Sequence, residues 1–496
     1  MLGNLIRFSV RQSGVVLMLA LLLLVYGAYR LGHAGLDIFP EFAAPRVIVQ
    51  TEAQGLTAEQ TETLVTQRIE KHLAGLIGLD TLRSESIQGL SVVTAIFKDG
   101  TDLYRNRQLV GERLNALVGE LPAGAAPPVI VPLSSSSATV LTIGLRSDRH
   151  SLMDLRDRVD WTIAPRLLAV PGVADVNVFG GEIRQLQIQP DFDRLRRHGL
   201  SIDDVLIAAR QATGMPGSGF IENANQRIAI NLVGLPNTAE RLRQVVLLRR
   251  DGQQVTLGDV ATVVTGARPP IGAAAIGGQP GIVMMIIGQY GANTLSVSRA
   301  VERVLADFKT LFSQQGIDFY PQLFRPADYI ERSLQNLSGH LLIGGLLVVG
   351  VLYLFLFNLR TALIPALAIP LSLLAAVVSL LALGVHLNIM VLGGLAIALG
   401  EVVDDAIIDT ENIFRRLREN RLRARPVSAF RIVFEASMEV RGSVVYASFI
   451  VALVFLPLLT LGGVAGRLFA PLGDAYILSI LMSLLVALTV TPALCY

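Results

Sequence analysis

Five carboxylic acids follow an apolar stretch of this chain within eleven residues. The stretch VLGGLAIAL runs directly into GEVVDDAIIDTEN, residues 400–412, which contains Glu401, Asp404, Asp405, Asp409 and Glu411. On a helix with about 100° per residue, the five acids occupy one arc of about 160°, and valine, alanine, isoleucine and threonine fill the opposite arc. This pattern predicts a membrane helix whose acidic side faces the interior of a helical bundle.

The depth of these acids in the membrane decides their chemistry. If the helix left the membrane after Gly400 and continued as a solvated amphipathic helix, a span starting at Asn388 would have only 13 residues, too few to cross the hydrocarbon core. We therefore expect Asp404 and Asp405 to lie ~24–26 Å along the span, inside the membrane. Asp409 and Glu411 would lie at the cytoplasmic edge of the span. For these two acids, a place in the membrane and a place on a solvated helix both stay open.

Adjacent carboxylates in a desolvated bundle are suited to proton transfer. Burial disfavours their charged forms and each negative charge disfavours the other, so Asp404 and Asp405 should bind a proton near physiological pH and titrate as a unit. We predict a proton relay at this pair, with Glu401, Asp409 and Glu411 as supporting acids. An intramembrane aspartyl protease would need acids on facing helices, whereas a sodium site stays open because carboxylates are hard oxygen ligands.

The elements that must position these acids are apolar segments of membrane length. The chain has 496 residues and is 17% charged, against about 25% in soluble globular chains. Its net charge of +2 gives no indication of a nucleic-acid partner. Segments of ~20 residues cross a ~30 Å hydrocarbon core. The sequence predicts six such membrane spans, at residues 14–31, 338–357, 361–384, 388–408, 440–461 and 472–495.

Arginines indicate the orientation of the spans. Arg7 and Arg11 precede the first span, and eight arginines, from Arg415 to Arg441, are assigned to the connection between the fourth and fifth spans. The short loops on the opposite side contain only Arg467. We therefore expect a cytoplasmic N-terminus, a first span retained as a signal anchor, and an external region of roughly 300 residues after it.

The external region has the pattern of a mixed α/β fold. PRVIVQTEA is predicted as a strand, residues 57–74 as a helix, LDTLRSESI and LSVVTAIFK as strands, and residues 101–118 as a second helix, which is the start of a ferredoxin-like unit. A similar order restarts at ATVLTIGLRS, with GVADVNVFG and IRQLQIQP as the corresponding strand pair. Residues 182–271 interrupt this second unit. The region contains no phosphate-binding glycine loop, zinc spacing or nucleophile elbow, so the sequence does not predict an enzyme.

These features together resemble the resistance-nodulation-division (RND) efflux transporters, over all 496 residues. The motifs that carry the resemblance are VDDAII with the following EN, GGLAIALG, GTDLYRNRQLVGERLNALVGELPAG and GRLFAPL. The resemblance implies a membrane α-helical bundle of six transmembrane helices with a large α+β periplasmic region of ferredoxin-like repeats. It also implies that Asp404 is the central proton-binding aspartate and that Asp405 is the second one.

The resemblance further divides the chain into parts. Residues 1–31 would form the N-terminus and first helix, 32–135 the first porter subdomain, 136–181 with 272–332 the second porter subdomain, 182–271 a docking insert, and 333–496 the remaining helices.

Family resemblance also implies partners. Such permeases are homotrimers in the bacterial inner membrane that join a periplasmic adaptor and an outer-membrane channel and exchange protons for substrate without a cofactor. The hairpin FIENANQRIAI would reach into a neighbouring protomer. The family has two homologous halves, so the second half of the permease is an expected partner, and this chain would be a fragment or one of two polypeptides. The family's lysine partner of the aspartates lies in that second half, so we expect this chain to supply no charge partner and to be incompetent for transport alone.

The sequence features that indicate the substrate do not agree with one another. GTDLYRNRQ and DLRDRVDWTIAP are similar to the heavy-metal branch, whereas paired aspartates are typical of the multidrug branch, which exports hydrophobic organic compounds. Of two acids found in zinc- and cobalt-type members, Glu411 matches one and Ala398 replaces the other. Met390 and Cys495 stand at methionine positions of copper- and silver-type members and are candidate metal ligands, although a methionine such as Met390 is more often part of a core. The balance slightly favours a heavy-metal cation.

Two other classes of function fit the same architecture. One is a membrane-anchored sensor or assembly subunit that does not transport, and the other is a sodium- or proton-driven helper of protein or lipid export. Neutralising Asp404 and Asp405 would abolish the activity of a transporter or helper and leave a sensor intact.

Overall fold

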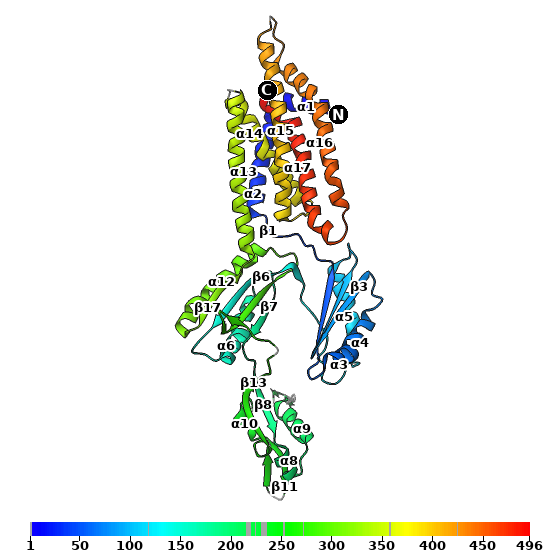
Figure 1. Cartoon of the computed structure of the whole chain (residues 1–496), viewed down its shortest axis with the longest axis vertical. Helices are drawn as coiled ribbons and strands as arrows, with labels where there is room; N and C mark the ends of the chain where they lie inside the picture. Colours follow the sequence, from blue (N-terminus) through cyan, green and yellow to red (C-terminus); the bar gives the residue numbers. More distant parts are fainter. Residues whose placement is uncertain are drawn as a thin grey trace.

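The computed structural model is elongated, with a helical bundle at one end, two sheet-containing units side by side below it, and a smaller unit at the far end (Figure 1). The structure describes residues 2–117, 119–214, 220–223, 225–229, 236–250, 253–270, 272–356, 359–423 and 425–496. Both chain termini lie at the outer end of the bundle (Figure 1).

Long helices run along the bundle. They are α2 (Ser13–His33), α13 (Ala327–Leu356), α14 (Leu359–Ala382), α15 (Ile389–Arg421), α16 (Ala429–Thr460) and α17 (Gly463–Cys495). A short helix, α1 (Leu2–Arg11), packs against α16 and α17 at the end that carries the termini. Among the described residues, four segments have both the length and the apolar composition of a membrane span, namely 13–33, 361–382, 429–460 and 463–495.

Helix α15 is longer than its predicted span. It begins at Ile389 and is capped by Asn388, whose side chain accepts a hydrogen bond of 3.0 Å from the backbone N–H of Val391, and it continues to Arg421 without a break at the acids. The segment after the acids stays helical because it is rich in arginine and glutamate, including the exposed i,i+4 pair of Arg415 and Glu419. The membrane span and the amphipathic helix that the sequence offered as alternatives are therefore parts of one helix.

Close approach of α15 to α17 depends on a glycine. A Cβ atom at Gly394 would lie 2.5 Å from the backbone oxygen of Leu472. Small side chains also form the buried face of α17, including Ala475, Ser479 and Ser483. This close contact fixes which side of α15 faces the bundle.

The first external unit is a four-stranded antiparallel sheet covered by helices. Its strands are β2 (Arg46–Glu52), β3 (Leu79–Ile87), β4 (Leu90–Phe97) and β5 (Val129–Ile130), in the order β3-β4-β2-β5. The predicted helices appear as the continuous run α3 (Ala58–Thr61), η1 (Glu62–Thr66) and α4 (Gln67–Leu73), and as α5 (Leu103–Ala116). Strand β4 alternates half-buried and buried residues, as expected of a sheet with one face in the core.

The second external unit repeats this strand order. Its strands are β6 (Ser134–Arg146), β7 (Val173–Gly180), β16 (Ile282–Gln289) and β17 (Asp318–Phe324), in the order β17-β6-β16-β7. Its helical segments are α6 (Leu152–Arg158), η2 (Val159–Ile163), α7 (Ala164–Leu168) and α12 (Thr294–Gln315), and a small hairpin of β14 (Ala275–Ile276) and β15 (Gln279–Pro280) precedes β16. In each unit the first strand is therefore flanked by the third and the fourth.

One predicted strand pairing is wrong. IRQLQIQP forms β8 (Arg184–Pro190), which pairs with β13 (Ala261–Ala267) rather than with β7. Strand β7 pairs instead with β16. The chain leaves the sheet at Gly180 and Gly181, whose φ angles of 75° and 73° are readily adopted only by glycine. The sequence repeat was misleading because this turn sends the second strand into the inserted unit.

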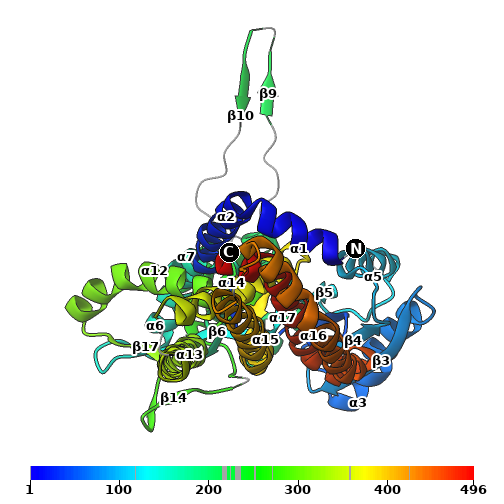
Figure 2. The ribbon, with the colours of Figure 1, turned by 90° about the horizontal axis from the view of Figure 1, so that it is seen from above.

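The insert between β7 and β16 has its own small core. It contains α8 (Phe192–His198), α9 (Ile202–Thr213), β9 (Phe220–Glu222), β10 (Arg227–Ala229), α10 (Ala239–Arg243), β11 (Val246–Arg250), β12 (Gln253–Thr256) and α11 (Leu257–Val260), besides β8 and β13. The predicted hairpin is present as antiparallel β9 and β10, and it projects far beyond the body of the molecule (Figure 2). Ala224 and Ile230 of that prediction lie outside the described residues.

A short parallel strand pair connects the bundle to the second unit. Strand β1 (Leu36–Asp37), directly after α2, pairs with β18 (Leu387–Asn388), directly before α15. The carboxylate of Asp37 accepts a hydrogen bond of 2.9 Å from the backbone N–H of Thr294, and Asn293 Nδ2 donates one of 2.7 Å to the Leu36 carbonyl. The starts of α12 and α15 are therefore held at one junction.

Candidate functional site

The five acids of α15 do not share one inward side. Asp405 is 8% exposed and Asp409 is fully buried, whereas Glu401 is half-buried and Asp404 and Glu411 are exposed in this chain. The inward face also includes Val402, Ala406 and Thr410, which the sequence interpretation placed on the outer arc. Within this chain the predicted common face is not buried as a whole, because the close packing against α17 rotates the buried side of α15 by about 90° from the centre of the acidic arc.

Asp405 is held by a serine of the neighbouring helix. Ser483 Oγ, on the buried face of α17, donates a hydrogen bond of 3.0 Å to Asp405 Oδ2. A buried carboxylate with one hydrogen-bond donor can exist in the ionised or the protonated form, because the hydroxyl can donate to the first and accept from the second. The site can therefore exchange a proton without rebuilding the helix contact.

Asp409 faces an arginine that lies one helix away. Arg441 of α16 is 2% exposed, and its Nη2 lies 3.3 Å from Asp409 Oδ2. The same Nη2 donates a hydrogen bond of 3.1 Å to the carbonyl of Ala487 on α17. Three helices of the bundle therefore meet at this one ion pair.

One sequence expectation is corrected by Arg441. It was assigned to the cytoplasmic connection, but it lies within α16 and is buried. The expected lack of a charge partner concerned Asp404 and Asp405, whereas Arg441 pairs with a third acid, Asp409. The available indication was that Arg441 falls inside the predicted span 440–461, where a basic residue needs a partner.

The surroundings of this ion pair contain polar atoms without partners. Within the described part of the chain, both carboxylate oxygens of Asp409 and the Nε and Nη1 atoms of Arg441 are buried and make no hydrogen bond. The hydroxyls of Ser437, one turn before Arg441 on α16, and of Thr491, one turn after Ala487 on α17, are also buried and unpartnered. Buried polar groups in proteins are nearly always hydrogen-bonded to protein or to ordered water.

The chain matches one known family over nearly its whole length. The sequence profile of the AcrB/AcrD/AcrF family, which comprises RND permeases, matches residues 5–496. The chain belongs to this family. The structure of a heavy metal efflux pump solved by X-ray crystallography aligns with 99% of this RND chain, with a TM-score of 0.86 and 27% sequence identity.

Curated relatives of this RND chain are named for cation efflux and metal resistance. Protein HelA of Legionella pneumophila is 33% identical over 99% of this chain and 47% of its own length. The cobalt-zinc-cadmium resistance protein CzcA of Cupriavidus metallidurans is 31% identical over 99% and 47%, and the cation efflux system protein CusA of Escherichia coli K12 is 32% identical over 100% and 48%. The chain therefore spans about half the length of the relatives it matches.

The two candidate metal ligands of this RND chain lie far apart. Met390 is in the first turn of α15, ~28 Å along the helix from Asp409. Cys495 ends α17 and packs against the apolar cluster of Ile413 and Leu488, near the opposite end of the bundle. They cannot bind one ion together. Among the described residues, no group of three or more His, Cys, Asp or Glu side chains could hold a metal ion.

A cleft lies between the two external units of the RND chain. It has a volume of about 430 Å³ and is lined by residues that include Glu41, Tyr104, Arg107 and Tyr290. Burial, the Glu41 carboxylate and Tyr104 raise the pKa of Tyr290. Glu41 is already occupied, since it accepts hydrogen bonds of 2.8 and 2.6 Å from the N–H and hydroxyl of Ser136. The cleft is polar, but its Glu41 carboxylate binds Ser136 and its Asp102 carboxylate caps the start of α5.

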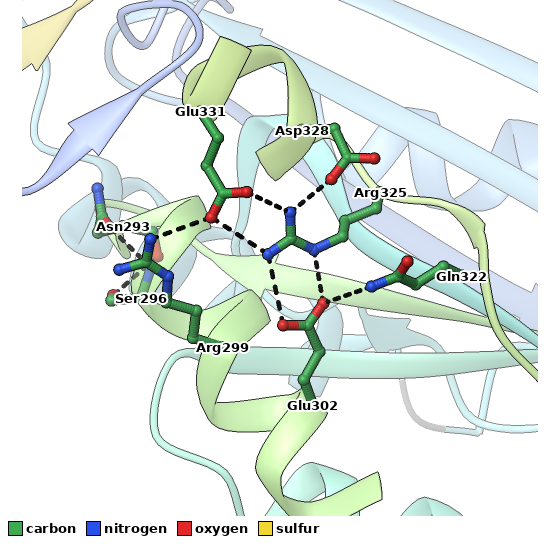
Figure 3. Close-up of polar contacts among 8 residues, drawn as sticks. All are labelled: Asn293, Ser296, Arg299, Glu302, Gln322, Arg325, Asp328 and Glu331. Carbon is green, nitrogen blue, oxygen red and sulfur yellow. Dashed lines mark hydrogen bonds and ion pairs between the residues drawn. The ribbon is translucent and has the colours of Figure 1, made fainter. Parts of the chain in front are cut away.

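An arginine network connects the second unit to the long helix α13 (Figure 3). Arg325, at the end of β17, contacts Glu302 of α12 at 2.5 Å and Asp328 and Glu331 of α13 at 2.5 and 3.0 Å. Burial opposes the charge of Arg325, but hydrogen bonds to the three carboxylates raise its pKa. The pKa of Glu331 is lowered, chiefly by its hydrogen bond to Arg325. This network joins elements on both sides of the point where α13 enters the bundle.

Proposed function

We propose that this chain is one half, the N-terminal half, of a proton-driven RND efflux permease that exports a heavy-metal cation. The observation that carries this proposal is the buried Asp405, hydrogen-bonded to Ser483 in the interior of an apolar bundle. An ionisable residue inside a membrane bundle is rare and expensive unless it has a function. Exchange of a proton at Asp405 would couple the pH gradient to movement of the helices around it.

The relay that we propose consists of Asp405 together with Asp404, with Glu401, Asp409 and Glu411 as supporting acids. Asp404 and Glu411 are exposed on the side of α15 that this chain leaves uncovered. We infer that the second half of the permease covers this side, since a carboxylate facing lipid would be unstable. Asp404 would then reach the partner half while Asp405 stays within this one.

The heavy-metal substrate is supported by the names of relatives. CzcA is named for cobalt, zinc and cadmium, and CusA for cation efflux. Since Met390 and Cys495 lie near opposite ends of the bundle, they give no support for an intramembrane metal path within this half. The paired aspartates support the alternative, an exporter of hydrophobic organic compounds.

Membership of the RND family supports the assembly that we propose. We propose six transmembrane helices with the N-terminus in the cytoplasm and both external units in the periplasm, each unit being a ferredoxin-like porter subdomain. The extended hairpin β9–β10 would reach a neighbouring protomer of a homotrimer (Figure 2). A periplasmic adaptor and an outer-membrane channel would complete the envelope complex, with protons as the coupling ion and no cofactor.

The test uses the whole permease, with both halves, in inverted vesicles that carry a pH gradient. Zinc, copper(I) or an organic dye is added, and proton release is recorded for wild type, Asp404→Asn, Asp405→Asn and the control Glu419→Gln on the exposed part of α15. Release triggered by a metal, lost in both aspartate variants and kept in the control, supports the proposal. Release triggered only by the dye would favour the organic exporter, and no substrate-dependent release at all would favour a sensor or assembly subunit.

A further inference from the structure

Six buried polar side chains lie around the contact of α15, α16 and α17. We call this series the polar file. Its members are Asp405, Asp409, Ser437, Arg441, Ser483 and Thr491. Ser483 bonds Asp405 and Arg441 pairs with Asp409, whereas Ser437 and Thr491 lie one turn from Arg441 and from Ala487, whose carbonyl Arg441 binds. Each of the six is less than about one-tenth exposed. A bundle interior made only for packing would carry apolar side chains at these positions.

The polar file has a direction. Asp409 is one turn beyond Asp405 toward the end of α15 that lies with the chain termini (Figure 1). Ser437 and Thr491 continue the series in the same direction from Arg441 and Ala487. On the other side of Asp405, Glu401 is half-buried, and buried Ser479 already donates a hydrogen bond to the carbonyl of Ala475 on its own helix. Among the described residues of α15, α16 and α17, the buried polar atoms without a hydrogen-bond partner all lie between Asp405 and the end of the bundle that carries the termini.

The ion pair in the middle of the polar file is poorly satisfied. Arg441 Nη2 lies 3.3 Å from Asp409, but the described residues provide no hydrogen-bond partner for either oxygen of Asp409 or for Nε and Nη1 of Arg441. A pair that only fastened two helices would be expected to satisfy these atoms with protein groups, because an unsatisfied buried charge is strongly destabilising. Donors and acceptors that converge in this way are suited to bind water.

The charged groups nearest Asp409 come from α15 and α16. They are Arg441, which pairs with it, and Asp405, one turn earlier on its own helix. The charges of Glu401, Arg441 and Asp404 act on Asp405, and the charge of Asp409 acts on the Cys495 thiol of α17. Residues 361–382 of α14 contain no ionisable side chain. Arg441 is therefore the one cation of this set, and it faces Asp409 directly.

We propose that Asp409 and Arg441 form a second proton-transfer site, reached from Asp405 through water bound along the polar file, which opens toward the end of the bundle that carries the termini. This inference rests on the proposed proton-coupled transport. The proton leaves the protonated carboxyl of Asp405 and is accepted by the ionised carboxylate of Asp409, ~6 Å further along the helix. Arg441 keeps its charge and pairs with Asp405 instead. The three side chains sum to zero charge before and after, so the transfer leaves no net charge in the membrane interior.

The test uses the whole permease reconstituted in vesicles, with substrate-driven proton flux measured as a function of pH. Four forms are compared, namely wild type, Asp409→Asn, Arg441→Gln and the double variant Asp409→Asn with Arg441→Gln. The double variant removes both charges and so avoids an unpaired buried ion, which guards against a simple failure to fold. Loss of the second site should slow flux at least about tenfold in the double variant and change its pH profile.

A second readout does not depend on transport. Infrared difference spectra recorded during a pH titration report the carbonyl stretch of protonated carboxyl groups. Wild type should show contributions of both Asp405 and Asp409, and Asp409→Asn should lose one of them. Flux and pH profile unchanged in the double variant, or a spectrum that Asp409→Asn does not change, would overturn the inference. If Asp405→Asn also left the flux unchanged, the proposed function itself would fail.

Discussion

Two nearly buried arginines of this chain have opposite surroundings. Arg325, in the external region, is 8% exposed and contacts three carboxylates from two helices, so its positive charge is more than balanced (Figure 3). Arg441, in the bundle, is 2% exposed and has one carboxylate at 3.3 Å, while two of its nitrogens lack a partner among the described residues. A fully satisfied network makes its surroundings rigid, whereas a half-satisfied one can change partners.

This difference matches the places of the two arginines in the molecule. Arg325 lies between β17 and α13, at the point where the external region joins the bundle. Arg441 pairs with Asp409, one helical turn from Asp405, where the proposed proton transfer would need a cation that can change partners. We infer that Arg325 is a rigid connection and that Arg441 is a movable charge.

The largest effect is expected from Arg441→Gln. This change leaves Asp409 buried without a cation, and breaking a buried pair in this way costs about 3–5 kcal/mol. The double variant Asp409→Asn with Arg441→Gln should recover most of that loss, since no buried ion remains. Thermal unfolding of the whole permease in detergent measures the loss of stability in the single variant and in the double variant. Equal losses in the single and double variants would show that Arg441 acts through packing rather than through its charge.

A smaller loss is expected from Arg325→Gln. The substitution removes three ion pairs, but its carboxylates are partly exposed and can be hydrated, so we expect about 1–3 kcal/mol. The matched variant Arg325→Lys keeps the charge and loses the planar guanidinium that contacts several carboxylates, so its stability should lie between those of wild type and Arg325→Gln. Transport by Arg325→Gln should be reduced even at temperatures well below its melting temperature. Normal transport would contradict the role as a rigid connection.

Ser483→Ala should affect proton exchange more than stability. Asp405 would lose its hydrogen bond of 3.0 Å, a loss of about 1 kcal/mol. Proton release would slow several-fold without a change in assembly. Ser479→Ala is the control one turn away, because Ser479 bonds the carbonyl of Ala475 on its own helix. Equal effects of the two variants would show that the contact with Asp405 has no special role.

The smallest expected effect is the acid dependence of the Arg325 network. The pKa of Glu331 is lowered from its ordinary value of 4.5 by Arg325. The ionised form therefore stabilises the folded chain above that value, and this contribution is lost as the pH falls through the lower, folded-state pKa. Melting temperatures measured from neutral pH downward should decline less steeply in Glu331→Gln than in wild type. Parallel curves would show that the network contributes nothing measurable.

Much of the fold follows from the sequence. The apolar runs predict the helices, and α5 and β4 lie close to the ranges expected from periodicity because their patterns are local. The pairing of β7 with β16 could not be predicted, since 101 residues separate Gly180 from Ile282 and only the glycine turn reveals the departure. Strand pairing across an insert is a property of tertiary structure.

The sequence pointed to Asp405 and Asp409, but not to the side of α15 that packs or to their partners Ser483 and Arg441. The helical wheel placed the acids together, but it cannot tell which side of α15 packs, because that depends on Gly394 against Leu472 in another helix. Arg441 was missed because an arginine near a helix end also fits the rule for membrane orientation. The contact with Asp409 distinguishes these two roles.

The most direct test of proton coupling is metal uptake driven by an imposed pH gradient. The whole permease is placed in inverted vesicles, zinc uptake is followed with the gradient present and after it is collapsed, and wild type is compared with Asp405→Asn and Glu419→Gln. We predict uptake that requires the gradient, is lost in Asp405→Asn and persists in Glu419→Gln. Uptake that continues after the gradient is collapsed, or that Asp405→Asn leaves intact, would contradict the account.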